Sequence, residues 1–131
     1  MKRDRILNPD LISSIAAIGH TEYLVIADAG LPVPAGVKVL DLSLIQGIPS
    51  FEQVLEAVNQ ELVIESYIVA EEMPQKNAAL CQKTQEVLSG LPHKMVLHEE
   101  FKRLTENAKT IVRTGETSPF ANVILVAGVN F

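Results

Sequence analysis

Cysteine and tryptophan are the scarcest residues in this sequence. Among 131 residues there is no tryptophan, and Cys81 is the only cysteine. One thiol cannot form a disulfide within the chain, which is typical of proteins from a reducing compartment. No cysteine pair and no His-x-x-x-His spacing occurs, so the sequence contains no zinc signature. These absences favour a cytoplasmic protein without a metal centre.

Positive charge and long hydrophobic runs are also lacking. The 11 Lys and Arg residues are outnumbered by 16 Asp and Glu residues, giving a net charge of −5. Such a protein repels phosphate backbones, so we expect no nucleic-acid partner. The longest uncharged stretch, Thr117–Phe131, is shorter than the roughly 20 residues of a membrane helix. Asn8-Pro9-Asp10 breaks the sequence behind the basic N-terminus, unlike a secretory signal, so we expect a soluble protein with no membrane contact.

Hydrophobic residues, in contrast, are plentiful. They make up 47% of the sequence, against 21% charged residues, which is enough to build a core in a chain of this length. We therefore predict one compact domain spanning residues 1–131.

Short apolar runs alternate along the chain with amphipathic stretches. Strands are expected over residues 23–27, 37–42, 62–70, 94–97, 110–113 and 122–127. Helices are expected over residues 8–18, 50–60 and 77–88, and from residue 98 onward. This alternation predicts an α/β three-layer sandwich with a mostly parallel central sheet flanked by helices. Only about eight residues join the last two strands, too few for a parallel crossover, so the sheet is predicted to be mixed.

A small set of polar residues could carry chemistry. His20 and His98 directly follow a helix and a strand, positions where α/β sheets place functional groups. Asp28 adjoins a buried run, and Asn122 stands at the start of the last strand. Since no glycine-rich phosphate loop and no nucleophile elbow occur, the residues favour an acid/base or binding site.

Each candidate also has a purely structural interpretation. A histidine at the edge of an element is often a simple hydrogen-bonding group, and Asp28 could accept bonds from its own turn. Arg113 and Glu116 could pin the last loop by an ion pair while Asn122 caps it, or Asn122 could be an exposed amide that holds a ligand.

Two other features favour the structural interpretation. Glu71-Glu72 imitates a catalytic carboxylate pair, but adjacent strand residues point to opposite faces, so we expect a solvated strand end. Cys81 lies among apolar residues of a predicted helix, so we expect a buried and unreactive thiol.

Several blocks of residues carry a resemblance to a known family. They are Gly19-His20, Asp28 to Pro34, Gln46 to Phe51, Arg113 to Glu116, Pro119 to Leu125 and Gly128 to Phe131. In this order the blocks closely resemble the D-ribose pyranase family, and the likeness runs from Leu7-Asn8 to the last residue. The related fucose mutarotase family shares some motifs, but the Asp-Ala-Gly-Leu-Pro block is more similar to the ribose branch.

The resemblance implies a ribose pyranase-like fold and an isomerase that needs no cofactor. The expected reaction interconverts the β-pyranose and β-furanose forms of D-ribose in the cytoplasm and supplies furanose for ribose catabolism. The resemblance also implies a homodecamer of two pentameric rings with the site at a subunit boundary. We therefore expect His98 and the C-terminal segment to meet a neighbouring subunit, while the sequence leaves open which chain supplies which residue.

Roles for individual residues also follow from the resemblance. The family's proton donor falls on His20, and its sugar-binding positions fall on Asp28, His98, Phe120, Ala121 and Asn122. Position 120 is commonly tyrosine in the family, so this chain lacks a phenolic hydroxyl there and retains only stacking or backbone contacts.

Two alternatives to the pyranase hypothesis remain open. One is a non-catalytic sugar-binding accessory of ribose uptake, with the same polar cluster holding the sugar without turning it over. The other is a mutarotase of another sugar, such as fucose.

Overall fold

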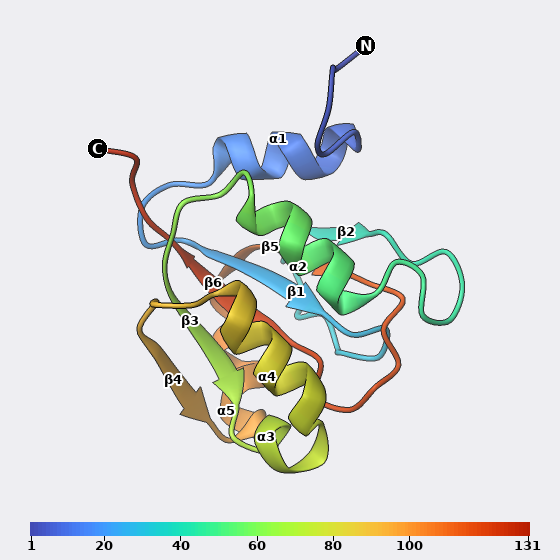
Figure 1. Ribbon diagram of the computed structural model, residues 1–131, viewed down its shortest axis with the longest axis vertical. Coiled ribbons are helices and arrows are strands. Elements are labelled where there is room, and N and C mark those ends of the chain that lie inside the picture. The colour runs from blue at the N-terminus through green and yellow to red at the C-terminus, as the bar shows by residue number, and fades with distance from the viewer.

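The computed structural model describes residues 1–131 as a six-stranded sheet with helices on both faces (Figure 1). The strands are β1 (Tyr23–Ala27), β2 (Val39–Asp41), β3 (Ile64–Ala70), β4 (His93–Val96), β5 (Ala108–Arg113) and β6 (Val123–Ala127). The helices are α1 (Pro9–Ala17), α2 (Phe51–Asn59), α3 (Met73–Lys76), α4 (Ala78–Val87), α5 (His98–Leu104) and the 3₁₀ turn η1 (Thr105–Asn107). None of the helices is both long and apolar enough to cross a membrane.

The sheet is mixed, as the short link before β6 predicts. Its strand order is β2-β5-β1-β6-β3-β4. β5 pairs in parallel with β1 and β2, and β4 pairs in parallel with β3. β6 is antiparallel to both of its neighbours, β1 and β3. The carboxyl ends of five strands and the start of β6 therefore meet at one edge of the sheet.

Two helix-capping signals in the sequence form the local contacts that they predict. The Asn8 side chain accepts a bond from the Leu11 nitrogen and caps α1. Ser50 and Gln53 form a reciprocal capping box at the start of α2, which satisfies two backbone donors that a helix start leaves free. Both helices begin at the residues that the sequence predicts.

Helices cover the two faces of the sheet unequally. The larger apolar cluster packs α1, α2 and α4 against one face, which is turned toward the viewer in Figure 1. The smaller cluster lies on the other face, where α5 inserts the fully buried Phe101 among residues such as Val25 and Ile124. The resulting helix–sheet–helix sandwich confirms the predicted fold class.

The bounds of β3, β4, β5 and β6 differ from the sequence prediction by one or two residues, and two further differences have a clear physical reason. β2 begins at Val39 instead of Val37, because the Val37 nitrogen bonds the Pro34 carbonyl in a turn that delays the strand. The helical turn α3 was not predicted. It starts at the fully buried Met73, and Pro74 suits the first turn of a helix.

Gly115 allows the loop after β5 to approach the loop before α2. A Cβ atom at this position would lie 2.5 Å from the Ile48 oxygen and 2.7 Å from the Ile45 oxygen. We expect Gly115→Ala to lower the free energy of unfolding by roughly 1–3 kcal/mol, because backbone atoms must shift. Urea unfolding measures this. Gly30→Ala is the control, since its new Cβ would stay 3.7 Å from its nearest neighbour, and equal effects in the two variants would contradict the prediction.

Candidate active site

Asp28 and Asn122 are joined directly at the edge where the parallel strands end. The Asn122 side chain accepts a bond from the Asp28 nitrogen at 2.8 Å. Its amide group donates to the Asp28 carboxylate at 3.0 Å. Asn122 is only 1% exposed, so the structure corrects the interpretation of an exposed amide that is free to hold a ligand. Asn122 instead fixes the position of Asp28.

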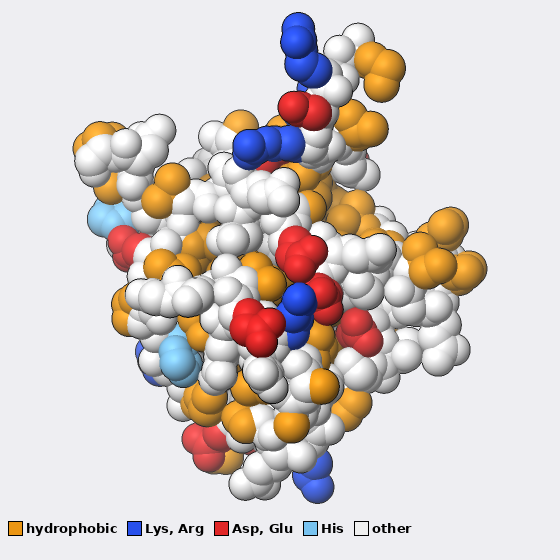
Figure 2. All heavy atoms as spheres, viewed as in Figure 1, with side chains coloured by type: hydrophobic (Ala, Val, Ile, Leu, Met, Phe, Trp, Pro, Cys, Tyr) orange, Lys and Arg blue, Asp and Glu red, His pale blue; other side chains and the backbone are white.

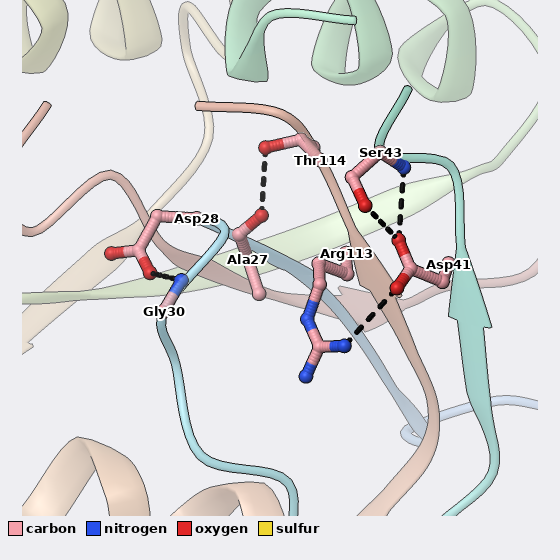
Figure 3. A network of polar contacts seen from close by, with 7 residues as sticks. All are labelled: Ala27, Asp28, Gly30, Asp41, Ser43, Arg113 and Thr114. Carbon is pink, nitrogen blue, oxygen red and sulfur yellow. Dashed lines mark hydrogen bonds and ion pairs between the residues drawn. The ribbon is translucent and has the colours of Figure 1, made fainter. Parts of the chain in front are cut away.

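The other Asp28 oxygen confirms the predicted turn. It accepts a bond from the Gly30 nitrogen at 2.9 Å, and Figure 3 shows the carboxylate turned back toward that loop. The neighbouring strand end is also fixed, because the buried Thr114 donates its hydroxyl hydrogen to the Ala27 carbonyl at 2.8 Å (Figure 3). Asp28 is thus a half-buried carboxylate with a defined orientation.

His98 begins α5 immediately after β4, at the same edge. The His98 backbone nitrogen donates to both carboxylate oxygens of Glu72, at 2.9 and 3.2 Å. Its ring stacks on Phe101 and meets the edge of Phe120, with centroids 5.1 Å apart. Nδ1 is buried without a partner. The expectation that Glu71-Glu72 is only a solvated strand end is therefore wrong for Glu72, which holds His98 in place.

The segment before β6 connects these groups. Phe120 has a φ of 56°, which is unusual for a bulky residue, and its carbonyl accepts a bond from the Asn122 nitrogen at 2.9 Å. Ala121 between them is fully buried. One short segment therefore places a ring against His98 and an amide against Asp28, so five of the six candidate residues gather at one edge.

His20 lies apart from this group. It follows α1 and precedes β1, whereas Asp28 follows β1. Five strand residues at ~3.3 Å each separate the two ends of β1 by about 17 Å. The His20 Nε2 atom lies 2.8 Å from a carboxylate oxygen of Glu65. No single small ligand can contact His20 and Asp28 of the same chain.

Glu116 is a site residue that the sequence interpretation placed wrongly. It does not pair with Arg113, which forms an ion pair with Asp41 at 3.1 Å (Figure 3). Its carboxylate accepts bonds from the Phe51 nitrogen and from Ser118. Opposite charge alone favours Arg113 as the partner of Glu116. The free backbone nitrogen at the start of α2 is the actual partner, and only folding brings it near.

Two pockets border the candidate residues. One of about 420 Å³ lies over Asp28 and extends along Glu116 to Pro119. The other, of about 320 Å³, lies beside His20 at the opposite edge and reaches the C-terminal residues. A third, of about 430 Å³ around Tyr67 and His93, touches none of the candidates. Asp28 and His20 therefore lie in two separate open pockets, which we call the two half-sites. His98, Phe120, Ala121 and Asn122 line neither pocket.

The remaining chemistry of the chain is limited. Nowhere do three His, Cys, Asp or Glu side chains group as a metal ion would require. Cys81 is buried, and this burial raises the pKa of its thiol, so the predicted unreactive cysteine is confirmed. The arrangement can bind hydroxyl groups and transfer protons.

Removing the Asn122 amide should loosen Asp28. We expect Asn122→Leu to lower the free energy of unfolding by about 1–3 kcal/mol, since the Asp28 nitrogen loses its acceptor in a buried setting. Urea unfolding provides the measurement. Asn59→Leu is the control, because Asn59 is exposed and makes only a 3.3 Å bond to the Val87 carbonyl. Equal stability losses in both variants would show that the Asp28 contact has no special weight.

The helix–sheet–helix sandwich and its two open pockets define the chain as an α/β sandwich protein with polar pockets at opposite edges of the sheet. Residues 1–130 match the RbsD / FucU transport protein family. The chain belongs to this family.

Individual relatives agree with this assignment. A D-ribose pyranase of Geobacillus thermodenitrificans is 46% identical over 131 residues, covering 100% of this chain and 99% of that protein. The structure of Bacillus subtilis RbsD complexed with D-ribose superimposes with a TM-score of 0.97 at 44% identity, covering 100% of both chains. A fucose mutarotase in complex with L-fucose from Streptococcus pneumoniae shares the fold, with a TM-score of 0.82 at 22% identity over 95% of each chain.

Proposed function

We propose that this chain is a D-ribose pyranase that interconverts the β-pyranose and β-furanose forms of D-ribose without a cofactor. The full-length match to D-ribose pyranases, together with the near-identical fold of a relative bound to D-ribose, carries the proposal. The activity resides in one domain, residues 1–131, and takes place in the cytoplasm, where the furanose enters ribose catabolism.

The reaction needs only proton transfers. A proton delivered to the ring oxygen, and one removed from the anomeric hydroxyl, break the bond between C1 and the ring oxygen and leave an open-chain aldehyde. Attack of a different hydroxyl on C1 closes the five-membered ring and reverses these transfers. Groups that titrate near neutral pH and are held in position accelerate such steps by typically ~10²- to 10⁴-fold.

Each candidate residue has a role in this reaction. His20 donates the proton to the ring oxygen, because imidazole can give and take protons at neutral pH. Asp28 and His98 hold the sugar hydroxyls and share the proton transfers. Phe120 and Ala121 supply a ring surface and backbone contacts, and Asn122 orients Asp28 through the two bonds between them.

The proposed active unit is a homodecamer of two pentameric rings, with each site shared between neighbouring subunits. The distance along β1 supports this division, since His20 and Asp28 of one chain lie at opposite ends of that strand. Neighbours packed head to tail in a ring bring one end of a subunit against the other end of the next. The site is then completed only by assembly.

Saturation-exchange NMR on D-ribose tests the activity directly. Catalytic amounts of the protein should accelerate exchange between pyranose and furanose signals, and His20→Ala should abolish the acceleration. His93→Asn is the control, because His93 lies on β4, stacked on Tyr67, outside both half-sites.

The same measurement separates the alternative functions. Exchange at the background rate with the wild-type protein would favour a non-catalytic sugar binder, and faster exchange of fucose than of ribose would favour a mutarotase. Full activity of His20→Ala would contradict its role.

A further inference from the structure

His20 has one side-chain partner, and it comes from a distant part of the sequence. Glu65 lies 45 positions further along, near the start of β3, where the pairing with β6 shifts register. Its Oε2 atom lies 2.8 Å from His20 Nε2. An ionised carboxylate only accepts hydrogen bonds, so Nε2 must carry the hydrogen and donate it. This contact leaves Nδ1 of His20 without a protein partner.

The backbone around His20 is fixed independently of Glu65. The Glu22 carboxylate accepts a bond from the Gly19 nitrogen at 2.8 Å and pairs with Lys109 at 3.6 Å. These two contacts lower the pKa of Glu22, the backbone bond most strongly. The Thr21 nitrogen bonds the Ala127 carbonyl at 2.8 Å, and Thr21 has a φ of 69°, a costly conformation for a β-branched residue. The main chain is therefore held, and the ring orientation is set by Glu65.

The other carboxylates near His20 have partners of their own. Glu22 is committed to Gly19 and Lys109. Glu61 lines the same pocket, and its carboxylate accepts a bond from the Ile6 nitrogen at 3.2 Å. Phe131 also lines this pocket and is apolar in its side chain. Glu65 is the one carboxylate bonded to the imidazole.

We propose that Glu65 is the positioning residue of His20 and that Nδ1 of His20 exchanges the proton with the sugar, an inference that rests on the proposed function. In the charged imidazole Nδ1–H gives its proton to the ring oxygen, while Nε2–H stays bonded to Glu65. The neutral ring that results carries its lone pair on Nδ1. The anomeric hydroxyl meanwhile gives its proton to Asp28 or His98, which share the proton transfers. As the new ring closes, Nδ1 takes the proton of the attacking hydroxyl and the aldehyde oxygen regains the proton that the anomeric hydroxyl lost, which restores the starting state.

A simple surface ion pair would behave differently from a positioning residue. The side chains of His20 and Glu65 are 52% and 42% exposed, and exposed pairs contribute little to stability. A carboxylate that orients a functional histidine has a much larger effect on activity, since it fixes both tautomer and ring direction. Replacement of Glu65 should therefore lower kcat and leave the midpoint of urea unfolding nearly unchanged.

Kinetics of Glu65→Ala and Glu65→Gln provide the first test. We expect Glu65→Ala to lower kcat for ribose exchange on the order of 10- to 100-fold with little change in KM. Glu65→Gln should retain more activity, because its amide oxygen still accepts from Nε2. Glu52→Ala is the matched control, since Glu52 is 41% exposed, pairs with Lys83 at 3.4 Å and lines neither half-site. An unchanged kcat in Glu65→Ala would overturn the proposal.

The tautomer of His20 provides a second test that does not depend on turnover. The chain has 3 histidines, so solid-state NMR of protein labelled with ¹⁵N-histidine, with His20→Asn to assign the signal, can resolve each ring. Under alkaline conditions His20 should carry its hydrogen on Nε2, and Glu65→Ala should give a mixture of tautomers. A wild-type Nδ1–H tautomer would overturn the proposal. Wild-type protein without exchange activity but with the Nε2–H tautomer would instead overturn the proposed function and retain the contact.

Discussion

An equimolar mixture of His20→Ala and Asp28→Ala chains, denatured and refolded together, should regain about a quarter of the wild-type ribose exchange activity. Each variant alone should have almost none. His20 and Asp28 stand at opposite ends of β1, so a site that uses both must take them from two chains. In a randomly mixed ring, about one boundary in four combines an intact His20 with an intact Asp28.

A second mixture separates shared sites from sites within one chain. Wild-type chains refolded with an equal amount of the double variant His20→Ala/Asp28→Ala should show about a quarter of full activity if sites are shared, and about half if they are not. Native mass spectrometry verifies that the chains have mixed. If Asp28→Ala fails to fold, His98→Ala replaces it, because His98 lies at the same strand edge. An inactive mixture of verified hetero-assemblies would contradict the shared site.

The sequence predicts most of the fold because its signals are local. β1 spans the predicted residues 23–27, since a short apolar run bounded by polar residues has few other solutions. The caps at Asn8 and Ser50 bind backbone nitrogens within three residues. The starts of α1 and α2 therefore need no knowledge of the tertiary structure. The turn α3 was missed because the burial of Met73 is a tertiary property.

The contacts of the candidate site join residues that are far apart in the sequence, so local patterns do not predict them. Asp28 was predicted to bond its own turn, which it does through Gly30, but its second bond depends on Asn122, 94 positions away. Likewise, Glu65 has no sequence signal that links it to His20. The two meet because β6 pairs with β3 on one side and its Ala127 carbonyl accepts a bond from the Thr21 nitrogen on the other. The predicted strand 23–27 already separates His20 from Asp28. The gathering of His98 and Asn122 at the Asp28 edge depends instead on how their strands pair, which the order of residues does not reveal.

An apolar loop between β2 and α2, held by backbone hydrogen bonds, offers a surface for a neighbouring subunit of the proposed assembly. Leu44, Ile45 and Ile48 are 76%, 62% and 50% exposed, and hydrophobic side chains gather at the right edge of Figure 2, where this loop projects. The Ile48 nitrogen bonds the Ile45 carbonyl at 3.0 Å. Because the loop is fixed before assembly, its contacts cost little ordering entropy.

A charge on this loop should therefore dissociate the proposed assembly. We expect Ile45→Asp to sediment as a smaller species and to lose ribose exchange activity while its circular dichroism stays native. Burying an unpaired carboxylate costs roughly 3 kcal/mol or more at each contact. Ile45→Val should assemble and remain active, and Ser13→Asp, on the exposed side of α1, controls for added charge. A dissociated Ile45→Asp variant with full activity would contradict the shared site, because a lone subunit cannot bring His20 within reach of Asp28.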